Sequence, residues 1–248
     1  MLKLSIVMCV FQNLHLTQQA VENLLDTDVP FELIVIDNGC TDGTAEYLAT
    51  RPVKVITNKV NRSIMPAWNQ GLDVADGDFV MFTCNDMIVH PTAFGRMIEV
   101  MRQDPEVYCV CPEFTDIEMP RGWWAKAKRM AEEPVKWKII GPPMPPHPPD
   151  DQMMGGCWVV SRKGWAEFGH LDPELPDWYG DPDIWCRFRA MGHPVVQCNA
   201  LIHHYQSMTT ARVPGIKTSY SFHAQKVFEA KWGKVQDVID DYNANPRL

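Results

Sequence analysis

The sequence predicts an α/β protein in which a doubly wound, mostly parallel, Rossmann-like sheet is flanked by helices. Short apolar runs alternate with segments of helical spacing as far as about residue 110. Turn-forming Asp, Asn and Gly residues follow several of these runs. With 248 residues, of which 46% are hydrophobic and 22% are charged, the chain can bury a large core without disulfide bridges.

The first strand is predicted at residues 4–11, a nearly continuous apolar run of the kind that is buried on both faces of a parallel sheet. A helix is expected from Thr17, because apolar residues then recur at helical spacing. Residues 31–36 form a second apolar run, which ends at the turn-forming sequence Asp37-Asn38-Gly39. The order is therefore strand, helix, strand.

The same alternation continues through the next two units. Residues 41–44 supply helix-capping side chains for a short helix at 45–49, and residues 53–57 form a third strand. The segment after Asn61 has helical spacing, and residues 78–84 return as a fourth strand. Alternating strands and helices predict right-handed crossovers and parallel pairing.

After residue 110 the composition changes. Seven of the sixteen residues from 134 to 149 are Pro, which predicts an extended loop. The preceding segment, residues 121–138, carries six basic against two acidic residues, with three Trp interleaved. Regular structure is expected again at 155–160, in a helix at 184–191, in a run that ends at His203-His204, and in a helical tail over 219–242.

Charge and cysteine content exclude several classes of protein. The net charge of −8 argues against a general binder of polyanions and places nucleic acid second among the expected partners. The eight Cys include no C-x-x-C pair, which indicates reduced thiols and a reducing compartment. The apolar run at the start is too short to cross a membrane, so we expect no transmembrane segment and a cytoplasmic location. No G-x-G-x-x-G follows the first strand, which excludes a dinucleotide-dependent oxidoreductase.

Polar residues that directly follow the apolar runs are the candidate site, because ligands bind beyond the carboxyl ends of parallel strands. They are Asp37, Asn85 with Asp86, and His203 with His204. Each alone is typical of a turn or a helix cap, but all three groups are expected at one sheet edge. Carboxylate and imidazole at such an edge predict a Mg²⁺ or Mn²⁺ site that a diphosphate completes.

An acidic stretch from 172 to 183 offers a candidate base. Asp183 directly precedes a helical pattern and is assigned to capping. Asp181 comes earlier, beside Trp178 and Tyr179, whose rings can stack on a substrate ring. We therefore expect Asp181 to act as a general base towards a hydroxyl nucleophile.

The ordered set of motifs resembles family 2 nucleotide-sugar glycosyltransferases of the GT-A fold. Residues 32–44 (ELIVIDNGCTDGT) are similar to the family's V-D-D/N-G-S-x-D-G-T, and Cys84-Asn85-Asp86 falls where the family has its D-x-D metal motif. Further similar pieces are 5–11 (SIVMCVF), 61–63 (NRS), 69–72 (NQGL), 75–80 (ADGDFV), 155–157 (GGC), 168–172 (FGHLD), 180–187 (GDPDIWCR) and 203–204 (HH). The resemblance covers about residues 4 to 207.

The resemblance implies a GT-A domain with a donor-binding half at 1–110 and an acceptor-binding and catalytic half at 111–218. The helical spacing near the end of the chain predicts a C-terminal helical tail at 219–248. It implies an inverting glycosyltransferase that uses a nucleoside-diphosphate sugar, a UDP-sugar first, with Mn²⁺ or Mg²⁺. Asp86 and one of His203 and His204 would bind the metal, and Asp181 would be the base. The implied contacts to the nucleotide sugar are Val10, Phe11, Asp37, Asn61, Asn69 and Asn85.

The acceptor is expected to be a saccharide or glycoconjugate that stacks on Trp123, Trp124, Trp178 and Tyr179. Two alternatives stay open: an acceptor that is a modified nucleic acid base, and a catalytically dead nucleotide-binding scaffold on the same fold. The sequence departs from the family at four positions. Cys84 replaces the first acid of the metal motif and Gly180 the acid before Asp181, while Gln12 replaces an Asn and Ser63 a Gly.

Overall fold

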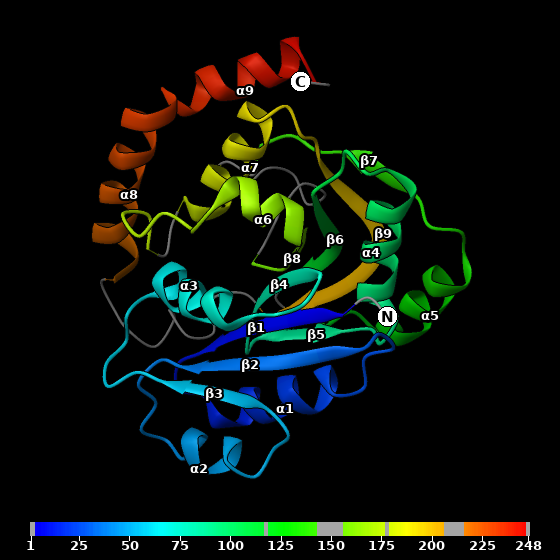
Figure 1. The fold of residues 1–248 in the computed structure, drawn as a ribbon, viewed down its shortest axis with the longest axis vertical. Coiled ribbons are helices and arrows are strands. Elements are labelled where there is room, and N and C mark those ends of the chain that lie inside the picture. Colours follow the sequence, from blue (N-terminus) through cyan, green and yellow to red (C-terminus); the bar gives the residue numbers. More distant parts are fainter. Residues whose placement is uncertain (1–2, 117–118, 143–155, 177–178, 206–215, 247–248) are drawn as a thin grey trace.

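We analysed a computed structural model, which describes residues 3–116, 119–142, 156–176, 179–205 and 216–246. Its strands are β1 (Leu4–Val10), β2 (Phe31–Asp37), β3 (Lys54–Thr57), β4 (Phe79–Cys84), β5 (Met87–Val89), β6 (Cys109–Asp116), β7 (Trp137–Ile139), β8 (Trp158–Ser161) and β9 (Val195–His204). Its helices are α1 (Leu14–Leu24), α2 (Thr44–Leu48), α3 (Ile64–Val74), α4 (Ala93–Gln103), α5 (Trp123–Glu132), α6 (Arg162–Phe168), α7 (Gly180–Ala190), α8 (Ile216–Trp232) and α9 (Val235–Ala244). Figure 1 shows these helices around one central sheet.

The described strands form one sheet in the order β3-β2-β1-β4-β8-β6-β9-β5, and β7 pairs with β9 beside this path. The first four neighbours, β3 to β4, are parallel, as the alternating pattern predicts. The second half is mixed, because β8 lies antiparallel to both β4 and β6, and β5 and β7 are antiparallel to β9. The α/β class is confirmed, and the mostly parallel arrangement holds for the half before residue 110.

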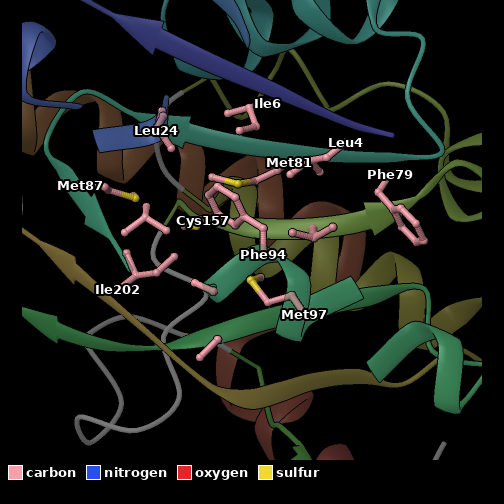
Figure 2. Packing of buried hydrophobic residues seen from close by; sticks show 14 of the residues in the cluster. Leu4, Ile6, Leu24, Phe79, Met81, Met87, Phe94, Met97, Cys157 and Ile202 are labelled. Carbon is pink, nitrogen blue, oxygen red and sulfur yellow. The ribbon is translucent and has the colours of Figure 1, made fainter. Parts of the chain in front are cut away.

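The central strand β1 explains why the core has two layers. All seven of its residues are buried, and alternate side chains point to opposite faces of the sheet. Val7 and Cys9 join the cluster beneath α3, α6 and α7, together with the rings of Trp68, Phe82 and Trp158. Leu4, Ile6, Met8 and Val10 join the cluster on the other face, which Figure 2 shows packed with α1 and α4.

The strands and helices predicted before residue 84 are confirmed within a few residues. The segment expected as an extended loop at 134–149 contains the short strand β7, and its residues from 143 onward lie outside the described residues. The predicted helical tail is two helices, because Gly233 adopts a left-handed φ of 87° that ends α8. The structure also contains elements that the sequence did not predict: helices α4, α5 and α6 and strands β5 and β6.

The C-terminal helices are tied to α7. Lys231 Nζ lies 2.7 Å from Asp183 Oδ1 and 2.9 Å from Asp172 Oδ2. Trp232 Nε1 donates to Asp183 Oδ1 at 2.8 Å, and Arg189 pairs with Asp241 at 2.8 Å. These contacts hold α7, the helix that begins next to the candidate base Asp181, against the C-terminal helices. Among the helices of the described residues, none has the length and apolar character that a bilayer crossing requires.

Candidate active site

The candidate site lies where β4 ends. The chain leaves β4 at Cys84, passes Asn85 and Asp86, and enters β5, whose first residue Met87 pairs with His204 of β9. This antiparallel pairing brings a late histidine to a residue more than a hundred positions earlier in the chain. The Tyr205 N–H donates to the carbonyl of Asp86 at 2.9 Å and fixes the register.

Asp86 and His204 are the two side chains that fit a divalent metal. Asp86 is 6% exposed, and its Oδ1 atom accepts no hydrogen bond from the described residues. Oδ1 lies 3.5 Å from His204 Nε2. A buried carboxylate oxygen without a hydrogen bond is costly, and a bound cation would compensate it. No group of three or more His, Cys, Asp or Glu among the described residues is arranged to hold a metal ion, so a metal here would complete its shell with phosphate and water.

The geometry separates the two histidines. Neighbouring residues of a strand point to opposite faces, so His203 and His204 cannot share one site. His203 is fully buried, 2.9 Å from the hydroxyl of Thr115 through Nδ1, and its ring packs against Tyr205 with centroids 4.5 Å apart. The geometry therefore favours His204 as the metal ligand and gives His203 a packing role.

Asp181 stands at the start of α7, facing the same region. Burial raises the pKa of its carboxyl from 3.8 to about 6, while a hydrogen bond from Trp158, the charge of His204 and the Gly156 N–H lower it. Trp158 Nε1 donates to Asp181 Oδ1 at 3.3 Å. A carboxylate with a pKa near neutrality can accept a proton from a hydroxyl and release it afterwards.

Cys84 links the two acids. Burial raises the pKa of its thiol well above the ordinary value, and the charges of Asp86 and Asp181 raise it further. The three side chains therefore share one electrostatic environment, in which the thiol stays neutral and leaves Asp86 as the acid of the motif.

Gly180, which also departs from the family's sequence pattern, packs closely against Met65. A Cβ atom on Gly180 would lie 2.0 Å from Cε of Met65, so Met65 occupies the space that a larger side chain would need. The acid that the family carries at this position is thus replaced by a glycine and a methionine that fit each other.

The expected nucleotide pocket starts at the ends of β1 and β2. Asp37 is 1% exposed, and its Oδ1 accepts the Cys40 N–H at 2.9 Å. Cys40 Sγ in turn accepts the Gln12 N–H at 3.1 Å, which joins this turn to the chain after β1. Val10 is fully buried and Phe11 partly buried. Asp37 therefore lies beside Val10, its partner in the sheet, and near the chain that follows β1.

The asparagines have structural partners. Asn38 Nδ2 donates to Asn61 Oδ1 at 2.8 Å, and Asn61 Oδ1 also accepts the Ser63 N–H, so Asn61 holds the loop that leads into α3. Asn69 exchanges two hydrogen bonds of 2.9 Å with the backbone of Leu171 and ties α3 to the chain before α7. These bonds give Asn61 and Asn69 a positioning role at the rim of the predicted pocket.

Asn85 also positions the chain, and it leads to a residue that sequence reasoning missed. Its buried amide donates to Gln12 O at 3.1 Å and to Thr17 Oγ1 at 2.9 Å, so it joins β4 to the turn before α1. In that turn Gln12 and Asn13 adopt left-handed φ values of 56° and 59°. Asn13 is 9% exposed, and its Nδ2 has no hydrogen-bond partner among the described residues. Backbone strain and an unpaired buried donor mark Asn13 as a candidate ligand contact.

The predicted aromatic acceptor residues do not gather at one surface. Trp123 is 2% exposed and packs in the core, so the stacking role expected for it is corrected to a structural one. Tyr179 is 8% exposed and packs against Phe228 of α8, which also leaves no free ring face. Trp124 is 49% exposed. Trp178 lies outside the described residues.

The order of the strands and the helices on both faces of the sheet define a protein of the GT-A fold class. The family model described as glycosyl transferase family 2 matches residues 5–165, and the chain belongs to this family. The expectations of fold and of family that were drawn from the motifs are therefore confirmed.

Two solved structures share the fold. One is GalNAc-T7 with UDP, GalNAc and Mn²⁺, with a TM-score of 0.69 and 15% identity over 99% of this chain and 50% of that chain. The other is the mannosyltransferase PcManGT of Pyrobaculum calidifontis in complex with GDP-Man and Mn²⁺, with a TM-score of 0.60 and 16% identity over 82% and 56% of the respective chains. At these identities the likeness shows the fold.

Sequence similarity to curated proteins is confined to part of the chain. A poly-β-1,6-N-acetyl-D-glucosamine synthase of Staphylococcus epidermidis is 26% identical over 112 residues, which are 43% of this chain and 27% of that protein. The curated relatives that match do so over less than a third of their own length.

Proposed function

We propose that this glycosyltransferase moves a sugar from a nucleoside-diphosphate sugar, a UDP-sugar first, to a hydroxyl of a saccharide or glycoconjugate acceptor with inversion at the anomeric carbon. The observation that carries the proposal is the buried Asp86 carboxylate: its Oδ1 accepts no hydrogen bond from the described residues and lies 3.5 Å from His204 Nε2, and the carboxylate shares its environment with Asp181. Such a transfer needs two elements: a pair of side chains that can hold a cation, and a base whose pKa is close to neutral pH.

Asp86 and His204 would hold Mn²⁺ or Mg²⁺. When bound, the cation neutralises negative charge that grows on the departing diphosphate. Asp37, with Val10 and Phe11, would contact the donor base, while Asn61, Asn69 and Asn85 hold the loops around it. Asp181 would accept the proton of the acceptor hydroxyl as that oxygen attacks the sugar from the face opposite the diphosphate. This single displacement forms no covalent enzyme intermediate.

Two observations support a saccharide acceptor. Trp137 presents a partly exposed ring in the acceptor half, and sugar rings stack on such faces. One matching relative bears the name of a polysaccharide synthase. The net charge of −8 disfavours the modified nucleic acid base as acceptor.

Titration calorimetry with UDP, GDP, CDP and dTDP, each with and without Mn²⁺, tests the donor site. We expect Mn²⁺-dependent binding of one nucleotide, which Asp86→Asn weakens at least tenfold and the exposed control Asp26→Asn leaves unchanged. Asp181→Asn should retain nucleotide binding and lose sugar transfer, because it removes only the base. Binding without sugar transfer or donor hydrolysis in the unaltered protein would instead support a catalytically dead scaffold.

A further inference from the structure

The exposed face of helix α5 carries a concentration of positive charge that the reaction does not use. Trp123 and Ala127 are buried and dock the helix on a small hydrophobic cluster that includes Ile88 of β5 and Leu201 of β9. The opposite face is exposed and carries Lys126, Lys128 and Arg129, with Arg121 directly before the helix. In a protein with a net charge of −8, residues 121–138 hold six basic and two acidic side chains.

These cations lack partners within the part of the chain that the structure describes. Arg121, Lys126, Lys128 and Arg129 form no ion pair or hydrogen bond there, although Glu132 lies one turn from Lys128 on the same helix. Elsewhere on the surface, lysines commonly pair, as Lys54 does with Glu32 and Lys136 with Glu133. A group of cations that forms no ion pair with the described residues attracts an external anionic partner.

One exposed tryptophan stands among these charges. Trp124 is 49% exposed and sits one helical turn before Lys128. Its ring contacts Trp123 and, at a centroid distance of 6.1 Å, His90. Tryptophan flanked by Lys and Arg on a surface helix is typical of a segment that rests among lipid headgroups.

The helix is held rigidly at the outside of the molecule. Arg96 of α4 is 9% exposed and donates to the carbonyl oxygens of Ala131 and Glu133, at 3.2 and 2.9 Å, where α5 ends. Figure 1 places α5 at the periphery, beyond β9. Single-stranded nucleic acid tracks a charged groove with several stacking rings, whereas one convex helix with one exposed ring suits a flat surface.

We propose that the exposed face of α5 docks this protein on an anionic phospholipid surface. The cations bind the lipid phosphates, and Trp124 rests at the headgroup level. Docking here would place β9, whose end carries His204, beside the bilayer. The inference stands apart from the sugar transfer, since vesicle binding is measured without donor or acceptor.

Sedimentation of the full chain with vesicles tests the proposal. We expect binding to vesicles of equal parts phosphatidylglycerol and phosphatidylcholine, none to pure phosphatidylcholine, and release by 0.5 M salt. Each Lys or Arg near an anionic leaflet contributes about fivefold, so Lys126→Gln, Lys128→Gln and Arg129→Gln together should weaken binding about a hundredfold. The matched control, Arg102→Gln with Lys163→Gln and Lys234→Gln, removes the same charge from other exposed sites and should bind as the unaltered protein does.

Trp124→Phe provides a second readout that does not depend on charge. Brominated lipids should quench part of the tryptophan fluorescence of the unaltered protein, and the variant should lose that part. Equal binding to neutral vesicles, equal loss in both triple variants, or unchanged quenching in Trp124→Phe would overturn the proposal. Tighter binding to a single-stranded RNA than to the anionic vesicles, lost only in the α5 triple variant, would overturn it in favour of nucleic acid.

Discussion

At the scale of single residues, the candidate base shows a conflict between chemistry and stability. Burial raises the pKa of Asp181 to about 6, which means that the ionised carboxylate is less stable in the folded protein than in the unfolded chain. The contribution of Asp181 to the stability of the fold therefore decreases as the pH rises from 3.8 through about 6, and stays lowered above that. Residues that take part in a reaction often lower the stability of the fold in this way.

Asp181→Asn should consequently raise the melting temperature at pH 7.5 and leave it unchanged at pH 3.5, where both states are protonated. Thermal unfolding followed by circular dichroism across this pH range checks the expectation. Asp183→Asn, two positions away, is the matched control, and it should lower the melting temperature at pH 7.5 because it weakens the contacts to Lys231 and Arg187. A lowered melting temperature at pH 7.5 in Asp181→Asn would show that the carboxylate is stabilising.

The candidate site could be predicted from sequence only in part. Motif order brought Asp86, Asp181 and the histidine pair together, and the structure places these elements at one sheet edge. The choice between His203 and His204 depends on which face of β9 packs against α5. The sequence does not indicate this face, because both histidines follow the same apolar run. Asn13 was missed because its left-handed backbone and unpaired amide have no counterpart in residue spacing.

At the scale of elements, α3 shows how close contact with the sheet outweighs helix propensity. Gly71 faces β1, and a Cβ atom there would lie 2.2 Å from Cγ1 of Val7. Only a glycine lets the helix approach the strand this closely. The loop that leads into α3 and the Asn69 clamp to Leu171 both depend on that approach.

Gly71→Ala should destabilise the protein even though alanine favours helices. Propensity would contribute about 1 kcal/mol of stabilisation, while the steric clash costs about 1–3 kcal/mol and is not relieved by a flexible side chain, since Val7 is fully buried. Urea unfolding of the variant against Val74→Ala, an exposed position of the same helix that should be neutral or stabilising, checks the sign. Equal midpoints for the two variants would show that α3 can shift.

The elements that could not be predicted share a physical cause. Strand β8 has four residues, a length at which an apolar run fits parallel and antiparallel neighbours equally well. Its direction is set by its partners β4 and β6, which lie far away in the sequence. Helix α5 was hidden because its buried positions, Trp123 and Ala127, are surrounded by charge rather than by an apolar pattern.

At the scale of the whole molecule, the C-terminal helices act as a brace for α7. Lys231 contacts Asp183, which is 1% exposed, and Asp172, whose pKa burial would raise but the Lys231 ammonium holds below its ordinary value. The lowered pKa of Asp172 means that this contribution to stability is present above pH 3.8 and is lost as the pH falls. The brace therefore secures the helix at whose start Asp181 stands.

Lys231→Met should lower the free energy of unfolding by about 1–3 kcal/mol, because the buried Asp183 side chain would lose one of its two cationic partners. Lys231→Arg should recover most of the loss. Urea unfolding at pH 7.5 and at pH 3 measures both, and the difference between Lys231→Met and the unaltered protein should shrink at the lower pH. A loss of equal size at both pH values would show that the lysine acts through packing of its aliphatic stem.

The position of β8 in the sheet bears on how the protein is made. Strand β4 is complete at residue 84, but the strand that covers its open edge ends at residue 161. During synthesis the first four parallel strands remain unpaired along β4 while nearly as many residues again emerge. A newly made chain is thus most exposed to wrong pairing between these two points, and a chaperone that acts during translation would have its greatest effect there.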